Sequence, residues 1–151
     1  GKRQSWPDGK LIRLVLRPAT DSDTAILKKI SPEMNRAVEK ALSRQGLIMA
    51  ITNQESDNAV EKTPGSLGAS TLTQVISEGR SLKILAFNGV TPSAENLVQG
   101  KYPLSKRFFI VTKQKISANV RNFLDFVKSG KGRKLLEKTG NVVIDRSSSG
   151  Q

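Results

Sequence analysis

Segments with the residue pattern of β-strands alternate along this chain with segments that begin with helix-capping residues. Residues 11–16 are rich in aliphatic and β-branched side chains and predict a buried strand, and the acidic and hydroxyl cluster at 21–24 is typical of a helix start. Ser31 followed by Pro32 predicts a second helix, and the apolar run 47–52 predicts an interior strand. This alternation favours an α/β fold, because each helix can cover the sheet formed by its neighbouring strands.

The same alternation continues to the end of the chain. Further strands are predicted at residues 66–70, 81–87, 108–112 and 142–144, and further helices at 58–62, 72–78, 93–98, 120–127 and after Ser129. The last five residues are expected to form a frayed tail. We therefore expect one α/β lobe of three layers, with a mixed sheet flanked by helices.

The chain contains neither histidine nor cysteine. This excludes zinc fingers, thiolate nucleophiles, hydrolytic centres that use histidine, iron–sulfur clusters and histidine-ligated haem. A hard cation held by carboxylates stays open, but the acidic residues are spread over helix-like and loop segments, which is typical of surface charge. We therefore expect no catalytic residue, no metal and no cofactor, and a protein that is not an enzyme.

The positive charge is concentrated in the last third of the chain. The formal net charge is +12, of which residues 1–100 carry +3 and residues 101–151 carry +9. A basic segment can contact nucleic acid, an acidic protein or a membrane surface, or it can be the solvated face of helices. We favour solvated helix faces over a nucleic-acid surface, because few aromatic side chains are interleaved with the cations.

The sequence shows no run of apolar residues long enough to span a membrane, and its first six residues include neither an initiator methionine nor the apolar segment of a signal peptide. We expect the chain to begin inside a longer gene product or after processing. The absence of cysteine is compatible with an oxidising compartment.

Arg17 and the four residues Asp21, Ser22, Asp23 and Thr24 are the best candidate for a binding site. They lie where a strand is predicted to end and a helix to begin, a junction that offers backbone N–H groups to an anion. The guanidinium of Arg17 could grip a tetrahedral oxyanion, the hydroxyls could add donors, and Asp21 could orient Arg17. The alternative is purely structural: Asp21 or Ser22 caps the helix and Arg17 is a surface cation.

Five motifs resemble, in order, those of the phosphate-binding protein family of bacterial ABC transporters, which has a type 2 periplasmic-binding-protein fold. They are the predicted strand with its Arg17-to-Thr24 loop, the Thr-Pro-Gly-Ser-Leu-Gly run at 63–68, the Asn-Gly-Val-Thr-Pro-Ser-Ala-Glu-Asn turn at 88–96, Gly-Lys-Tyr-Pro-Leu-Ser-Lys-Arg at 100–107, and Phe-Leu-Asp-Phe-Val-Lys-Ser at 123–129. The first motif departs from the family pattern in two ways, with one extra residue between Arg17 and Ser22, and with Asp23 where the family has glycine.

The resemblance implies half of a two-lobed receptor that holds an oxyanion in the cleft between its lobes. Residues 1–104 would form the second lobe, and residues 105–151 would return through the hinge toward a first lobe whose amino-terminal part is absent. Arg17 would grip the anion, Ser22 and Thr24 would donate hydrogen bonds, and Asp21 would support Arg17. The implied partners are a phosphate-like oxyanion and an ABC-transporter permease, and the implied location is periplasmic or extracellular.

Two other functions stay open at this point. The basic last third could form an interaction domain for nucleic acid or an acidic partner. Alternatively, a sensor or an enzyme could reuse the same lobe, because a fold does not fix its ligand.

Overall fold

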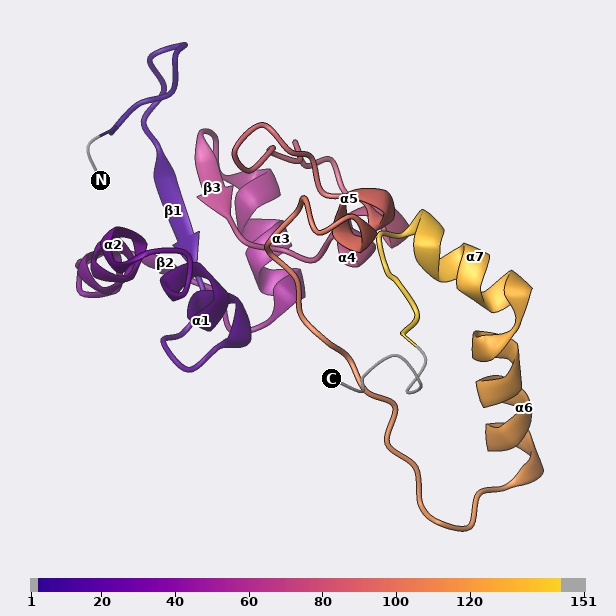
Figure 1. Cartoon of the computed structure of the whole chain (residues 1–151). Coiled ribbons are helices and arrows are strands. Elements are labelled where there is room, and N and C mark those ends of the chain that lie inside the picture. The colour runs from indigo at the N-terminus through magenta and orange to yellow at the C-terminus, as the bar shows by residue number, and fades with distance from the viewer. Residues whose placement is uncertain (1–2, 145–151) are drawn as a thin grey trace. The chain divides into compact units, whose positions relative to one another are not determined.

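The structure is a computed structural model, and it describes residues 3–144 (Figure 1). The chain forms two compact units, residues 1–83 and residues 84–151, each of which is described here by itself. The predicted frayed tail lies outside the described residues.

The first unit alternates strands and helices as the sequence predicts. Its elements are β1 (Arg13–Leu16), α1 (Ser22–Lys28), α2 (Pro32–Leu42), β2 (Ile48–Met49), α3 (Asn53–Lys62), β3 (Ser66–Gly68) and α4 (Leu72–Ser77). The predicted start of α2 is confirmed, because the Ser31 hydroxyl accepts the N–H of Met34 at 3.1 Å and Pro32 occupies the first helical position.

The three strands form one parallel sheet in the order β2-β1-β3. Val15 in the central strand is 1% exposed and pairs with Ile48 on one side and Gly68 on the other. Helix α3 packs against β1 and β3. Gly68 allows this close approach, because a Cβ at that position would lie 2.7 Å from Cγ2 of Val60 on α3.

The α/β class is confirmed, with two differences in the sheet. Strand β2, predicted to be interior, lies at the edge of the sheet among the strands that the structure describes. The segment predicted as a strand at 66–70 joins the sheet as β3, and the segments predicted at 81–87, 108–112 and 142–144 do not, so all pairings between those strands are parallel rather than mixed.

The second unit contains helices α5 (Ala94–Val98), α6 (Ala118–Lys128) and α7 (Gly130–Lys138). The predictions of strands at 81–87, 108–112 and 142–144 are wrong for this structure. Only Phe87 of these segments takes part in a bridge, exchanging two backbone hydrogen bonds with Val90 across an Asn88-Gly89 turn in which both residues have positive φ. A strand forms only against a partner strand, and none of the described residues supplies one for the other two segments.

Helices α6 and α7 meet at a sharp corner where Ser129 is both the end of one helix and the cap of the next. Gly132 lies in that corner. A Cβ on Gly132 would overlap the backbone carbonyl of Phe126 and would lie 2.8 Å from the carbonyl oxygen of Val127. The corner therefore requires glycine at 132.

Candidate anion-binding site

Arg17 directly follows β1 and is buried, with 7% of its surface exposed. Its Nη2 donates to the Asp21 carboxylate at 2.8 Å. The other two guanidinium nitrogens, Nε and Nη1, are also buried, and neither has a hydrogen-bond partner within the described part of the chain. A buried donor without a partner is costly, so these two nitrogens are suited to a ligand that is itself an acceptor.

Asp21 uses both carboxylate oxygens to organise the loop. Oδ2 holds Arg17, and Oδ1 accepts the N–H of Asp23 at 2.8 Å, which makes Asp21 the cap of α1. Asp21 therefore does two things: it supports Arg17, as predicted, and it caps α1, as the structural alternative proposed. The other part of that alternative, in which Arg17 is a surface cation, is excluded by the burial of Arg17.

The other three predicted site residues occupy the first turn of α1. Thr24 is 3% exposed, and its hydroxyl donates to the backbone carbonyl of Arg17 at 3.1 Å. This hydrogen bond connects the first turn of α1 to the residue that follows β1. Asp23 is buried at 8% exposure, and Ser22 is exposed. Direct contact of Ser22, Asp23 or Thr24 with a ligand stays a prediction.

The parallel register brings a second loop to the same edge of the sheet. Leu16 pairs with Met49, so Arg17 and the start of α3 both follow carboxyl ends of adjacent strands. Thr52 caps α3 in a capping box in which the Glu55 carboxylate accepts the backbone N–H of Ile51 at 2.7 Å and of Thr52 at 3.1 Å. These hydrogen bonds lower the pKa of Glu55, and the nearby charge of Arg17 adds to the effect.

Sequence reasoning missed this second loop, because it placed the helix start at residue 58. The signal was present, since Thr52 followed three residues later by Glu55 is the pattern of a capping box.

A buried carboxyl lies further along α3. Asp57 is 1% exposed, and burial raises its pKa against the opposing effects of the Ser70 hydroxyl and the Arg80 charge. The neighbouring Ser56 is fully buried, and its hydroxyl donates to the carbonyl of Ala69 just after β3 at 3.0 Å. The Ser56 hydrogen bond attaches the start of α3 to the chain just after β3.

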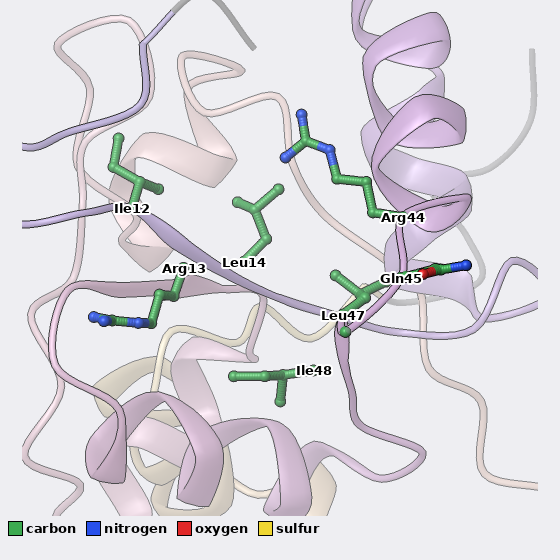
Figure 2. A pocket seen from close by; sticks show the side chains of 8 residues that line it. Ile12, Arg13, Leu14, Arg44, Gln45, Leu47 and Ile48 are labelled. Atoms are coloured by element: carbon green, nitrogen blue, oxygen red, sulfur yellow. The ribbon is translucent and has the colours of Figure 1, made fainter.

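The first unit also has an open groove of about 370 Å³, but it lies at the opposite end of the strands (Figure 2). Its lining includes Ile12, Leu14, Leu47 and Ile48, together with Arg13 and Arg44. Both arginines are exposed, and the Arg13 guanidinium donates to the carbonyl of Pro64 at 2.7 Å. The groove therefore lacks the buried, unsatisfied donors that distinguish Arg17.

Two kinds of feature are absent from the part of the chain that the structure describes. No group of three or more acidic side chains comes close enough together to hold a metal ion. No helix among residues 3–144 is long and apolar enough to cross a bilayer.

Comparison with known families gives a match over residues 1–131 to the family model described as the PBP superfamily domain. The chain belongs to this superfamily. The predicted membership of the periplasmic-binding-protein group is thereby confirmed.

The relatives are phosphate-binding proteins. The chain is 31% identical over 100 residues to phosphate-binding protein PstS 2 of Streptococcus agalactiae, covering 64% of this chain and 33% of that protein. It is 28% identical over 137 residues to phosphate-binding protein PstS of Bacillus subtilis, covering 85% of this chain and 41% of that protein. The chain thus spans well under half the length of these two relatives.

Two solved structures share the fold. The crystal structure of PstS from Borrelia burgdorferi superposes with a TM-score of 0.59 at 24% identity, over 95% of this chain and 59% of that one. A putative phosphate ABC transporter substrate-binding protein with bound phosphate from Clostridium perfringens superposes with a TM-score of 0.69 at 17% identity, over 95% of this chain and 58% of that one. The predicted fold class is confirmed by this likeness.

Proposed function

We propose that this chain is part of the solute-binding component of an ABC transporter and that it binds phosphate or a similar oxyanion without chemistry. The observation that carries the proposal is the buried Arg17 guanidinium, which has two nitrogens without hydrogen-bond partners among the described residues. An oxyanion supplies the acceptor oxygens that these donors need. The relatives are phosphate-binding proteins, which supports the same ligand class.

Arg17 is proposed as the residue that grips the anion, with Asp21 positioning it. Ser22, Asp23 and Thr24 are proposed to line the same site from the first turn of α1. Since α1 has only seven residues, the guanidinium rather than the helix would supply most of the favourable electrostatic energy. Because Asp23 places a carboxyl in this turn, the anion is expected to be one that tolerates a nearby acidic group.

The wider assignments follow from the same proposal. Residues 1–104 would form one lobe of a two-lobed receptor, and residues 105–151 would return toward the other lobe. The partners would be the oxyanion and a transporter permease, and the location would be periplasmic or extracellular. Since half of the cleft would lie outside this chain, we expect the 151 residues alone to bind the anion weakly.

Isothermal titration of the full-length gene product with phosphate, sulfate and molybdate tests the ligand. Saturable binding of at least one of the three is expected. Absence of binding for all three would refute the proposed ligand class.

The basic last third remains a second candidate surface for nucleic acid or an acidic protein. A gel-shift assay with DNA and RNA at low salt distinguishes it, because phosphate contacts weaken steeply as salt rises. Retardation that survives Arg17→Ala but is lost on charge reversal at Arg133 and Lys134 would favour this alternative.

A further inference from the structure

Asn88 and Gly89 form the tip of a two-residue turn in the connection that precedes α5. Both residues have positive φ, 50° for Asn88 and 80° for Gly89, and both are exposed. The N–H of Phe87 donates to the carbonyl of Val90 at 2.9 Å, and the N–H of Val90 donates to the carbonyl of Phe87 at 3.0 Å. This bridge is isolated, since no ladder extends it among the described residues. Little therefore prevents the turn from opening locally.

An asparagine followed by glycine can react with its own main chain. The nitrogen of the glycine attacks Cγ of the asparagine, the Cγ–Nδ2 bond breaks, and ammonia leaves with the proton that the attacking nitrogen gives up. Water then opens the resulting cyclic imide at one of its two carbonyls. Breaking the bond from nitrogen to Cγ gives aspartate, and breaking the bond from nitrogen to the main-chain carbonyl carbon gives isoaspartate. Glycine favours the reaction because it has no Cβ to obstruct the attack.

Among the eight asparagines of the chain, Asn88 is the only one that glycine follows. Six others lie in helices, where the regular backbone dihedral angles keep the next nitrogen away from Cγ. They are Asn35, Asn53, Asn58, Asn96, Asn119 and Asn122. Asn141 is followed by the β-branched Val142, and its side-chain amide donates to Oγ1 of Thr139 at 3.0 Å. The sequence and the structure together therefore select Asn88.

The reacting atoms at Asn88 are accessible. Neither the side chain of Asn88 nor the N–H of Gly89 has a hydrogen-bond partner among residues 3–144. The space beside Gly89 is open as well, because no atom lies within 4 Å of the place where a Cβ would stand. Once the bridge between Phe87 and Val90 opens, rotation of the backbone between Asn88 and Gly89 brings the nitrogen to Cγ.

The turn at Asp8 and Gly9 is a matched comparison within the same chain. Gly9 also has a positive φ, of 83°, and both residues are exposed. The Gly9 N–H, however, donates to the carbonyl of Trp6 at 3.0 Å. Nζ of Lys10 lies 2.8 Å from Oδ2 of Asp8, and its hydrogen bond to the carboxylate lowers the pKa of Asp8. Because an ionised carboxylate resists attack by the nitrogen, we expect this turn to stay unmodified at neutral pH.

We propose that Asn88 is a site of spontaneous modification, where ring closure with Gly89 converts it to aspartate and isoaspartate. Aspartate keeps the length of the main chain and, like asparagine, tolerates positive φ. Isoaspartate inserts the side-chain carbon into the main chain, so Phe87 and Val90 no longer face each other across a two-residue turn. The isoaspartate form therefore loses the bridge, and the aspartate form keeps it. Neither outcome depends on the ligand of the protein.

Ageing of the full-length gene product at physiological temperature tests the proposal. Trypsin releases residues 84–101 as one peptide, in which Asn96, followed by Leu97, is an internal control for Asn88. Tandem mass spectrometry is expected to show conversion at Asn88 at least about tenfold faster than at Asn96, a difference of about 1.4 kcal/mol in activation free energy. The rate should rise with pH, because the attacking nitrogen must lose its proton. Equal rates at the two asparagines, or an Asn88 that stays unmodified, would overturn the proposal.

Two further comparisons test the chemistry of the turn. Gly89→Ala is expected to slow conversion of Asn88 at least about tenfold, although alanine at positive φ strains the turn and favours its opening. Conversion as fast as in the wild type would refute the role of Gly89. The tryptic peptide 4–10 reports on Asp8 in the same digest. Isoaspartate there as early as at Asn88, detected with an isoaspartyl methyltransferase, would show that the hydrogen bond and the ion pair of that turn give no protection.

Hydrogen–deuterium exchange tests the effect on the bridge. The isoaspartate form, isolated by chromatography, is compared with unaged wild-type protein and with Asn88→Asp, which has the other product at the same position. We expect the amides of Phe87 and Val90 to lose protection in the isoaspartate form and to keep it in Asn88→Asp. Protection kept in both forms, or lost in both, would contradict the assigned difference between the two products.

Discussion

Replacing Arg17 by methionine in the full-length protein is expected to weaken oxyanion binding by two to four orders of magnitude. Methionine keeps most of the length of the side chain but removes Nε and Nη1, the two buried donors that lack partners among the described residues. Each hydrogen bond from a charged group contributes about 1.5–3 kcal/mol, so losing both costs about 3–6 kcal/mol. At about 1.4 kcal/mol per tenfold change, the dissociation constant rises by about 10²- to 10⁴-fold.

The same substitution is expected to change the stability of the anion-free protein far less. It removes the 2.8 Å ion pair to Asp21, but it also removes two buried donors that the anion-free chain leaves unsatisfied. Asp21 keeps its hydrogen bond from the N–H of Asp23, so α1 keeps its cap. The loss of affinity should therefore not be a consequence of unfolding.

Calorimetric titration with phosphate measures the affinity, and urea denaturation without phosphate measures the free energy of unfolding. Arg13→Met is the matched control, because Arg13 begins β1 whereas Arg17 follows its other end, and Arg13 is exposed. We expect its phosphate affinity to be unchanged. A loss below tenfold in Arg17→Met, or an equal loss in Arg13→Met, would refute the role of Arg17.

Three further predictions concern stability. Gly132→Ala is expected to lower the free energy of unfolding by about 1–3 kcal/mol, because the new Cβ would overlap with the end of α6. Gly130→Ala is the control, since nothing lies near its Cβ, and it should be neutral or stabilising by up to about 1 kcal/mol. Urea denaturation measures both changes. Because burial raises the pKa of Asp57, the native state binds its proton more tightly than the unfolded state, so stability falls as pH rises between the unfolded and folded pKa values. Asp57→Asn should remove this part of the pH dependence in thermal melts, and an unchanged profile would contradict it. Thr52→Ala should lower the free energy of unfolding by about 0.5–2 kcal/mol, because it removes the cap of α3. Urea denaturation measures this loss, and a urea unfolding curve identical to that of the wild type would show that the cap does not stabilise the protein.

Local signals in the sequence predicted the helix starts that are stabilised by residues close to them in the chain. Two helix starts were predicted from side chains that accept hydrogen bonds from nearby N–H groups: Ser31 before Pro32, and the acidic and hydroxyl cluster at 21–24. The structure shows both caps, Ser31 for α2 and Asp21 for α1. The Arg17 loop was recognised from its residue types and order, and its burial is consistent with that recognition. The strand predictions at 81–87, 108–112 and 142–144 failed because strand propensity is realised only against a partner.

The sequence by itself determined the α/β class, the starts of α1 and α2 at their caps, and the Arg17 loop as the candidate site. Tertiary structure alone decided that β2 lies at the sheet edge among the described strands, that Thr52 and Glu55 come to the same edge as Arg17, and that two nitrogens of Arg17 are left without partners. The physical reason is that caps and turns are set by contacts a few residues apart. Register, burial and hydrogen-bond satisfaction depend on residues that are distant in the chain and meet only after folding.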